Sequence, residues 1–390
     1  MPIHPNVRYI ECLINCFKGD DDLRFKKRPV IAVTGSAGKT TTKEMVASIL
    51  QRKLRIFKSK GNMNLPRFIS RQRKKITSKH KALILEYGMF KKGHIRRSCR
   101  LIQPNIGVVT MVGTAHIGNF GGSVKRVAGA KSELIRGMRQ TGTLFLNADD
   151  RNSRYLTTKG FKGRIYKVAI RNKAKYKASR IRYTNNGMSF NVKLGRKQER
   201  FRIPIFGKHN VYNALFAIGI SRQLGIPLST IRKGLITYQK PERRLRIYHL
   251  KNKVTLVDDS FSANPQATNA AIDALEQIGK KKRIAVLGDM LELGIYTKKG
   301  HRIVGAHAAK KKIHHLLTYG SKSRYTRNAA VRSGLPSSRA KHFTNRGKMH
   351  SYLKKIIKRN ATILVKGSHK MKMNRTVKFA MNTINKKVLK

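Results

Sequence analysis

Several residue types are scarce in this sequence of 390 residues, which has no tryptophan, three cysteines and only 17 acidic residues. Cys12, Cys16 and Cys99 are too few for a disulfide framework, and a site with two cysteines would leave a metal ion incompletely ligated. No apolar run approaches the roughly 18–20 residues that cross a bilayer. The N-terminus carries Arg8 and Glu11 and lacks the layout of a signal peptide, so we expect a cytoplasmic protein.

The shortage of acids gives the chain an extreme charge, because 87 lysines and arginines produce a formal net charge of +70. Such a balance is typical of proteins that bind polyanions. The basic residues are nevertheless spread along the whole chain, and no nucleic-acid-binding motif accompanies them. Many of the acids lie in motif-like segments, namely Glu86, Glu133, Asp149, Asp150, Asp258, Asp259, Asp289 and Glu292. This distribution favours an enzyme with a basic surface, and a non-catalytic polyanion-binding protein stays as an alternative.

One stretch organises the chain, Ile31-Ala-Val-Thr-Gly-Ser-Ala-Gly-Lys-Thr-Thr-Thr42. An apolar run enters a loop of small residues, and a helical pattern follows a Lys-Thr pair. This order is typical of a phosphate-binding loop, in which backbone N–H groups face the anion, the lysine reaches the outer phosphates and a threonine hydroxyl holds Mg²⁺. A tight turn between a strand and a helix would explain the glycines but not the Lys-Thr pair. We predict that a nucleoside triphosphate is bound by Gly35, Ser36, Ala37, Gly38, Lys39, Thr40 and Thr41.

Two further polar residues lie at or shortly after the ends of apolar runs. Glu86 ends the run of residues 82–85, and His116 lies shortly after the run of residues 106–110. Ligands of parallel α/β sheets lie beyond the carboxyl ends of the strands, so both side chains are candidates for a magnesium site. The alternatives are a glutamate that faces solvent and a structural histidine.

Asn210 and Asn213 are three residues apart at the start of a predicted helix over residues 210–224. That spacing places both amides on one helix face, where they could contact an adenine edge. Capping of the helix is the alternative for Asn210 and explains Asn213 poorly.

Apolar runs and helical patterns alternate through most of the chain, which predicts an α/β fold. We expect a short leader (1–28) and a central ATP-binding domain (29–240) with a mainly parallel sheet. Between residues 163 and 205 the pattern changes to short strands and turns, which predicts a small antiparallel subregion. In residues 241–390 strand and helix patterns alternate again, which predicts a Rossmann-like α/β domain. Further strands are predicted at 30–33, 82–85, 106–110, 143–146, 254–257, 283–287, 315–319 and 361–365.

Taken together and in order, the motifs resemble those of the Mur ligases, which form amide bonds in peptidoglycan synthesis with ATP. The resemblance covers residues 29 to about 380 and is closest to the members that add D-alanyl-D-alanine to UDP-N-acetylmuramoyl-tripeptide. The segments that carry it are Asn147-Ala-Asp-Asp150, Gly207-Lys-His-Asn-Val-Tyr-Asn213, Asp258-Asp-Ser-Phe-Ser-Ala-Asn-Pro265, Ala285-Val-Leu-Gly-Asp-Met-Leu-Glu-Leu-Gly294 and Val365-Lys-Gly-Ser368.

The resemblance implies a mechanism in which ATP phosphorylates a substrate carboxylate and an amine then attacks the acyl phosphate. It implies Lys39, Lys131 and His116 as catalytic residues, with Lys131 carried as a carbamate; a plain surface lysine is the alternative for Lys131. Mg²⁺ would be bound by Thr40, Glu86, His116 and the Lys131 carbamate. The nucleotide would also meet Asn210, Asn213, Arg244, Asp259 and Asn264.

The sequence departs from the family in two places. Members normally begin with a separate domain that binds the UDP end of the substrate, whereas 28 residues precede the predicted central domain here. The segment Gly61-Asn-Met-Asn64 also lacks the usual continuation. A truncated ligase for another acid and amine is therefore the alternative to the muramoyl-tripeptide enzyme. In either case we expect a monomer that uses ATP and Mg²⁺.

Overall fold

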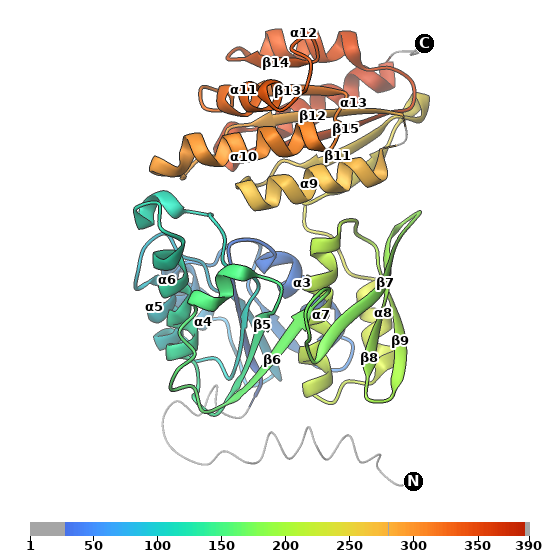
Figure 1. Cartoon of the computed structure of the whole chain (residues 1–390). Coiled ribbons are helices and arrows are strands. Elements are labelled where there is room, and N and C mark those ends of the chain that lie inside the picture. Colours follow the sequence, from blue (N-terminus) through green and yellow to red (C-terminus); the bar gives the residue numbers. More distant parts are fainter. Residues whose placement is uncertain (1–27, 280, 387–390) are drawn as a thin grey trace. The chain divides into compact units, whose positions relative to one another are not determined.

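The computed structural model describes residues 28–279 and 281–386, and within these ranges the chain forms two compact units (Figure 1). The first contains the residues up to Gly113, Ser123–Pro204 and Lys208–Pro241. The second contains Thr114–Gly122, Ile205–Gly207 and the chain from Glu242 onward. Cys12, Cys16 and residues 1–27 of the predicted leader lie outside the described residues.

The first unit is built on a nine-stranded sheet with the order β2-β3-β1-β4-β5-β6-β7-β8-β9. The strands from β2 to β7 pair in parallel, and β7, β8 and β9 pair antiparallel. The first strand is fully buried between two parallel neighbours, as its apolar sequence requires. The strands are β1 Val30–Thr34, β2 Ile56–Lys58, β3 Ala82–Glu86, β4 Ile106–Val109, β5 Thr143–Asn147, β6 Arg164–Ala169, β7 Tyr176–Thr184, β8 Gly187–Leu194 and β9 Lys197–Ile203.

Helices of this unit pack in two groups. One contains α4 (Pro66–Arg73), α5 (His94–Leu101) and α6 (Val124–Gly137). The other contains α3 (Lys39–Leu50), α7 (Lys208–Gln223) and α8 (Leu228–Ile236). In the second group, Gly234 of α8 lies against the backbone of α3, where a Cβ atom would come within 2.6 Å of the Ile49 Cα. A short 3₁₀ helix, η2 (Arg151–Tyr155), follows β5.

The second unit contains a six-stranded sheet with the order β10-β11-β15-β12-β13-β14, in which only the β10–β11 pair is antiparallel. Its strands are β10 Arg246–His249, β11 Thr255–Asp259, β12 Lys282–Gly288, β13 His315–Tyr319, β14 Ala340–Phe343 and β15 Ala361–Lys366. Its helices are α9 Pro265–Ile278, α10 Thr297–Lys310, α11 Arg324–Arg332, α12 Arg346–Ile356 and α13 Asn374–Lys386, with the 3₁₀ helices η1 Ile117–Phe120, η3 Lys251–Lys253, η4 Gly294–Tyr296 and η5 His369–Met371.

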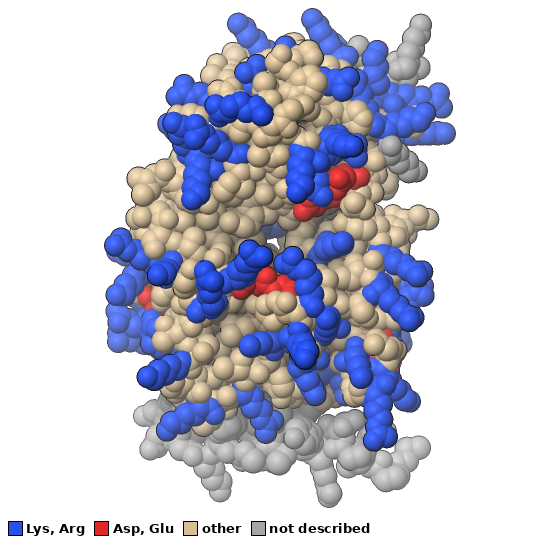
Figure 2. Space-filling view, in the orientation of Figure 1, with Lys and Arg blue, Asp and Glu red and all other residues tan. Residues whose placement is uncertain are grey.

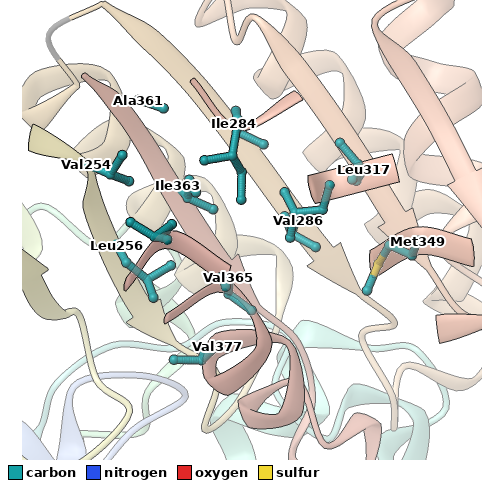
Figure 3. Close-up of a cluster of buried hydrophobic side chains, with 14 of the residues drawn as sticks. Val254, Leu256, Ile284, Val286, Leu317, Met349, Ala361, Ile363, Val365 and Val377 are labelled. Atoms are coloured by element: carbon teal, nitrogen blue, oxygen red, sulfur yellow. The ribbon is translucent and has the colours of Figure 1, made fainter. Parts of the chain in front are cut away.

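Aliphatic side chains from the central strands form the core of the second unit, as Figure 3 shows. Leu256, Ile284, Val286, Ile363 and Val365 alternate along β11, β12 and β15 and pack against Met349 and Val377 from the helices. Each of these side chains is buried, because parallel strands with helices on both faces need apolar residues throughout.

The predicted fold class is confirmed, because both sheets are mainly parallel and the antiparallel part falls where the sequence changes pattern. One detail differs from the prediction. β6 lies within the predicted antiparallel region but pairs in parallel with β5, and β7 joins it, so the antiparallel strands extend the large sheet. In residues 28–279 and 281–386, none of the helices is long and apolar enough to span a membrane.

Candidate active site

The loop between β1 and α3 has the backbone geometry of an anion cradle. Gly35 and Gly38 both have positive φ angles, of 148° and 83°. A Cβ atom on Gly35 would lie 1.8 Å from the Thr110 Oγ1 atom, and one on Gly38 would lie 2.5 Å from the Asn213 Oδ1 atom. The loop lies directly against the end of β4 and the start of α7, and for this reason only glycine fits at these two positions.

Lys39 begins α3, and its ammonium group is held at this loop. The Lys39 Nζ atom donates to the Gly35 carbonyl at 2.7 Å, which places the positive charge beside the loop backbone. The N-terminus of α3 has no acidic residue in its first turn and no side-chain cap. The helix dipole, the N–H groups of the first turn and the lysine therefore all favour an anion at this point.

Next to the loop, a carboxylate and a hydroxyl lie together at the end of β3. The Thr40 Oγ1 atom donates to Glu86 Oε2 at 2.9 Å, and the Asn64 amide donates to Glu86 Oε1 at 2.8 Å. The parallel pairing of β1 with β3 creates this arrangement, because Val33 and Glu86 are opposite each other. Glu86 is buried at 1% exposure and does not face solvent.

These oxygen atoms fit a Mg²⁺ ion of the kind that keeps most of its ligands from water and phosphate. A carboxylate and a hydroxyl from two elements would supply the protein ligands, as is common in phosphate-transferring sites. In the described part of the chain there is no group of three or more His, Cys, Asp and Glu side chains arranged to hold a metal ion by themselves. A Mg²⁺ ion bound by both the protein and the phosphates agrees with the Thr40–Glu86 pair and with the absence of a larger ligand group in the described residues.

Lys43 is a buried cation one turn further along α3. Its side chain is 0% exposed and forms an ion pair with Glu44, with 2.9 Å between Nζ and Oε1. Lys43 Nζ also donates to the carbonyls of Ser59 and Gly61, at 2.7 and 3.0 Å. The Ser59 hydroxyl in turn accepts from the Glu86 backbone N–H at 3.1 Å. Lys43 thus fixes the segment between β2 and α4 that touches Glu86 directly and carries Asn64.

Lys131 lies on α6 and is 2% exposed, which excludes the plain surface lysine. Burial and the neighbouring Lys39 cation lower the pKa of Lys131 well below its usual value, and Asp150 opposes this shift only in part. The pKa of Asp150 is raised, because burial outweighs the hydrogen bonds from the Val112 N–H and the Ser153 hydroxyl. Burial at this position therefore favours the neutral form of the Lys131 amine.

Asn210 and Asn213 face each other inside α7, which begins at Lys208. The Asn213 amide donates to Asn210 Oδ1 at 2.9 Å, and Thr42 Oγ1 donates to Asn213 Oδ1 at 3.1 Å. Both asparagines are buried, at 2% and 4% exposure. The shared face predicted from their spacing is present, and it lies against Gly38 of the phosphate loop.

Three other predicted residues lie in the second unit. Asp259 ends β11; its Oδ2 atom accepts from Lys366 Nζ at 2.6 Å and its Oδ1 atom from the Leu245 N–H at 3.1 Å. Arg244 donates to the Ser262 hydroxyl at 3.2 Å. Asn264 caps α9 by accepting from the Ala267 N–H at 2.9 Å.

His116 also belongs to the second unit through the contacts of the loop Thr114–Gly122. Its Nδ1 atom lies 2.5 Å from Glu292 Oε2, and the hydrogen bond from His116 lowers the pKa of Glu292. His116 has a left-handed backbone, with φ of 59°. Its predicted role as a metal ligand stays a prediction.

Comparison with known proteins decides the family. Residues 33–221 match the Mur ligase middle domain, and residues 243–369 match the Mur ligase, glutamate ligase domain. A relative from Bacillus subtilis, named UDP-N-acetylmuramoyl-tripeptide--D-alanyl-D-alanine ligase, is 32% identical over 353 residues, covering 90% of this chain and 75% of the relative. A protein of the same name from Haemophilus influenzae is also 32% identical, over 90% of this chain and 76% of its own length. The chain belongs to the Mur ligase family.

Solved Mur ligases share this fold. A MurF structure from Acinetobacter baumannii superposes with a TM-score of 0.84 at 26% identity, covering 97% of this chain and 80% of the other. MurF from Thermotoga maritima, solved with ADP, has a TM-score of 0.82 at 20% identity and covers 99% of this chain and 85% of its own. The predictions of a ligase and of this family are confirmed.

The sequence reasoning did not identify four residues around the candidate sites of this Mur ligase: Asn64, Lys43, Asp150 and Lys366. Asn64, Asp150 and Lys366 were noted only as members of short motifs. For Lys43, a signal was available in the sequence, because a lysine that follows three threonines inside a helix lies one turn from Lys39. Each of the four has a partner more than 15 residues away in the chain, namely Glu86 for Asn64, Ser59 for Lys43, the Val112 N–H for Asp150 and Asp259 for Lys366.

Proposed function

We propose that this Mur ligase joins the terminal carboxylate of UDP-N-acetylmuramoyl-tripeptide to the amine of D-alanyl-D-alanine with hydrolysis of ATP to ADP and phosphate. The relatives of that name, at 32% identity over 90% of the chain, support the substrates. The observation that carries the chemistry is the Thr40–Glu86 hydrogen bond of 2.9 Å beside the glycine loop. This hydrogen bond places a hydroxyl and a carboxylate, both suited to bind a metal ion that also contacts phosphate, at the N-terminus of α3.

In the proposed reaction, a substrate carboxylate oxygen attacks the terminal phosphorus of ATP and ADP leaves, which yields an acyl phosphate. The amine of the dipeptide then attacks the acyl carbon, and the intermediate collapses to an amide and phosphate. Such a reaction depends chiefly on positioning and on neutralising negative charge. Gly35, Ser36, Ala37, Gly38, Lys39, Thr40 and Thr41 would surround the phosphates and Lys39 would move from the Gly35 carbonyl onto them.

We assign Mg²⁺ to Thr40 and Glu86, with His116 and carbamylated Lys131 as proposed further ligands. When bound, the ion would neutralise charge on the phosphate oxygens. Asn64 orients the Glu86 carboxylate through its amide, so that one oxygen is directed to Thr40. Lys131 is suited to the carbamate because a neutral amine is the form that attacks CO₂; an N–C bond forms and a proton leaves to solvent.

We further propose that Asn210 and Asn213 contact the adenine. The C-terminal domain would contribute three further residues to nucleotide binding, Arg244, Asp259 and Asn264. The proposed limits of the two domains are residues 29–240 and 241–390. A monomeric, cytoplasmic enzyme is part of the same proposal.

Phosphate release tests this function. With ATP and Mg²⁺, release should require both the muramoyl-tripeptide and D-alanyl-D-alanine, and Lys39→Ala should abolish it. Lys53→Ala is the matched control, because Lys53 is exposed beyond the opposite end of α3. Turnover with another acid and amine, but not with this pair, would show the alternative ligase of different specificity. Lack of ATP turnover with any pair would refute the proposed activity.

The carbamate has its own test. Removal of CO₂ and bicarbonate should slow phosphate release, and bicarbonate should restore it. After incubation with ¹³C-bicarbonate, the wild-type protein should show a carbamate carbon signal that Lys131→Met lacks. An unchanged rate and an absent signal in the wild type would contradict the carbamate and leave the ligase proposal standing.

A further inference from the structure

The outer face of β7, β8 and β9 is a basic surface that the ligase site does not use. Apolar side chains of these strands, such as Phe190 and Phe201, are buried and point to one face. On that side α7 and α8 pack against the strands (Figure 1). The opposite face carries the alternate residues, because successive side chains of a strand point to opposite sides.

The strand register brings arginines into rows across this outer face. Arg182 is opposite Ser189, and Ser189 is opposite Arg202. In the next row, Ser179 is opposite Asn191 and Asn191 is opposite Arg200. Across β8, the backbones of Arg182 and Arg202 are about 9–10 Å apart, and along β9 those of Arg200 and Arg202 are about 7 Å apart. The middle strand contributes short polar side chains to these rows, the buried Ser189 and the half-buried Asn191.

The charge of this face has one sign. Arg182, Arg200, Arg202, Lys177 and Lys193 are exposed. Glu199 is the only acid of these three described strands; it pairs with Val192 on the inner face and forms an ion pair with Arg232 of α8. Within the described residues, the side chains of Arg182, Arg200 and Arg202 make no hydrogen bond or ion pair, so their guanidinium groups are available to a ligand.

The chemistry of the face distinguishes between classes of polyanion. None of the exposed large hydrophobic residues of the described chain lies on β7, β8 or β9, so the face lacks the apolar anchors of a membrane-surface helix. Four aromatic residues lie on these strands, and the register places all of them on the inner face: Tyr176, Tyr183, Phe190 and Phe201. The outer face of the described strands therefore has no aromatic platform on which unpaired bases could stack. Forked guanidinium groups are suited to phosphate oxygens.

We propose that the outer face of β7, β8 and β9 binds the phosphodiester backbone of double-stranded nucleic acid without regard to base sequence. The arginine rows contact phosphates, and the polar middle strand lies beneath the duplex. This surface is separate from the phosphate loop, so the proposal does not depend on the ligase activity.

The test compares two variants with the same loss of charge. In the first, Arg182, Arg200 and Arg202 are each replaced by glutamine. In the control, Arg96, Arg97 and Arg100, three exposed arginines of α5, are each replaced by glutamine. Binding of the full chain to a fluorescent mixed-sequence DNA duplex of about 20 base pairs is measured by anisotropy over a series of salt concentrations.

The sheet variant should bind at least about tenfold more weakly, and its slope of log K against log salt should become shallower by about 2 to 3, because three phosphate contacts are lost. The control should keep a slope within about 1 of the wild type. Equal weakening of both variants would overturn the proposal, since net charge alone would then explain binding. Failure of the wild type to bind the duplex would also overturn it.

Two further readouts complete the test. Single-stranded DNA of the same length should bind more weakly than the duplex, and a preference for the single strand would overturn the proposal. Vesicles that contain phosphatidylglycerol serve as the second probe. If the sheet variant lost vesicle binding but kept duplex binding, the face would be a membrane surface and the proposal would be wrong. Matching circular dichroism spectra and melting temperatures show that both variants are folded.

Discussion

Glu133 of α6 accepts hydrogen bonds from the backbone N–H groups of Gly93 and Arg96, at 2.6 and 3.0 Å, and so satisfies the N-terminus of α5. Asp289 does the same for Lys322 and Ser323 at the start of α11, with 2.6 Å to the Ser323 nitrogen. A helix N-terminus leaves N–H groups without partners, and a carboxylate complements both these groups and the dipole. A chain with 17 acids among 390 residues therefore places several of them where no lysine or arginine could replace them.

Substitution of Lys43 tests whether a single buried side chain positions the segment that contacts Glu86. Lys43→Met should remove the hydrogen bonds to the Ser59 and Gly61 carbonyls and leave these groups unsatisfied. Because hydrogen bonds that involve a charged group are strong, we expect a loss of about 1.5–3 kcal/mol in the free energy of unfolding, measured by urea denaturation. The segment that touches Glu86 should loosen, so the dependence of ADP affinity on Mg²⁺, measured by calorimetry, should weaken.

Lys58→Met is the matched control for Lys43→Met. Lys58 pairs with the same Glu44, at 2.6 Å, but its side chain is 44% exposed. Surface pairs contribute little, so this variant should lose less than about 1 kcal/mol and keep the Mg²⁺ dependence of the wild type. If the two variants were indistinguishable in both measurements, Lys43 would not be a positioning residue.

At the scale of secondary-structure elements, the buried central strands were predictable because their apolar runs are continuous. Sequence reasoning overlooked β2, β6, β10 and β14. Three of these, β2, β10 and β14, are edge strands that pair with a single neighbour. An edge strand can be short and charged, as Arg246–His249 is, and it then carries no apolar run. β6 was not predicted because most of its residues are exposed or half-buried, so that it carries no continuous apolar run.

The candidate site was predictable to a similar degree. Residues that end strands, such as Glu86 and Asp259, could be found because parallel strands place their carboxyl ends together. Asn64 could not, since its contact with Glu86 depends on the path of the segment between β2 and α4. Lys366 is another example: it meets Asp259 only because β11 and β15 are neighbours in the sheet, although more than a hundred residues separate them.

Asp149 links three elements and makes their packing depend on pH. Its carboxylate accepts from the N–H groups of Ile170, Arg171 and Asn172 after β6, and from the Tyr212 hydroxyl of α7. Burial alone would raise the pKa of Asp149, but these hydrogen bonds together hold it below its usual value. A carboxyl group whose pKa is lowered by folding stabilises the fold at pH values above its usual pKa of about 4. This stabilisation is lost as the pH falls through the lowered pKa of the folded state.

We therefore expect Asp149→Asn to lower the melting temperature by a constant amount between pH 5 and pH 7 and by progressively less below about pH 4. Thermal melts monitored by circular dichroism across this range measure the difference. Tyr212→Phe is the control, because it keeps the carboxylate and its backbone partners and removes one hydrogen bond. Its effect should vary less with pH. If the difference in melting temperature between the wild type and Asp149→Asn stayed constant down to about pH 3, the ionised Asp149 carboxylate would not be the source of the stabilisation.

At the scale of the whole molecule, the formal net charge of +70 is the dominant property. Lysines and arginines are spread over the face in view in Figure 2, where acids are few. Ion pairs such as Lys58 with Glu44 are correspondingly rare, since 87 basic residues share 17 acids. Charges of one sign repel each other in the folded state more than in the expanded chain, so the charge lowers stability.

Salt should therefore stabilise this protein. Raising sodium chloride from about 0.01 M to about 0.15 M shortens the Debye length from about 30 Å to about 8 Å and screens the repulsion between surface charges. We expect the melting temperature, measured by differential scanning calorimetry without nucleotide or nucleic acid, to rise over this interval. The rise should be steepest at low salt, because the screening length changes most there.

The glutamine variant of Arg96, Arg97 and Arg100 separates repulsion from a general salt effect. With three fewer cations, it should melt at a higher temperature than the wild type at low salt and gain less as salt is added. Sucrose acts by exclusion from the surface and not by screening, so it should raise the melting temperature of both proteins equally. If salt raised the melting temperature no more than sucrose at equal osmolality, or lowered it, self-repulsion would not limit the stability of this fold.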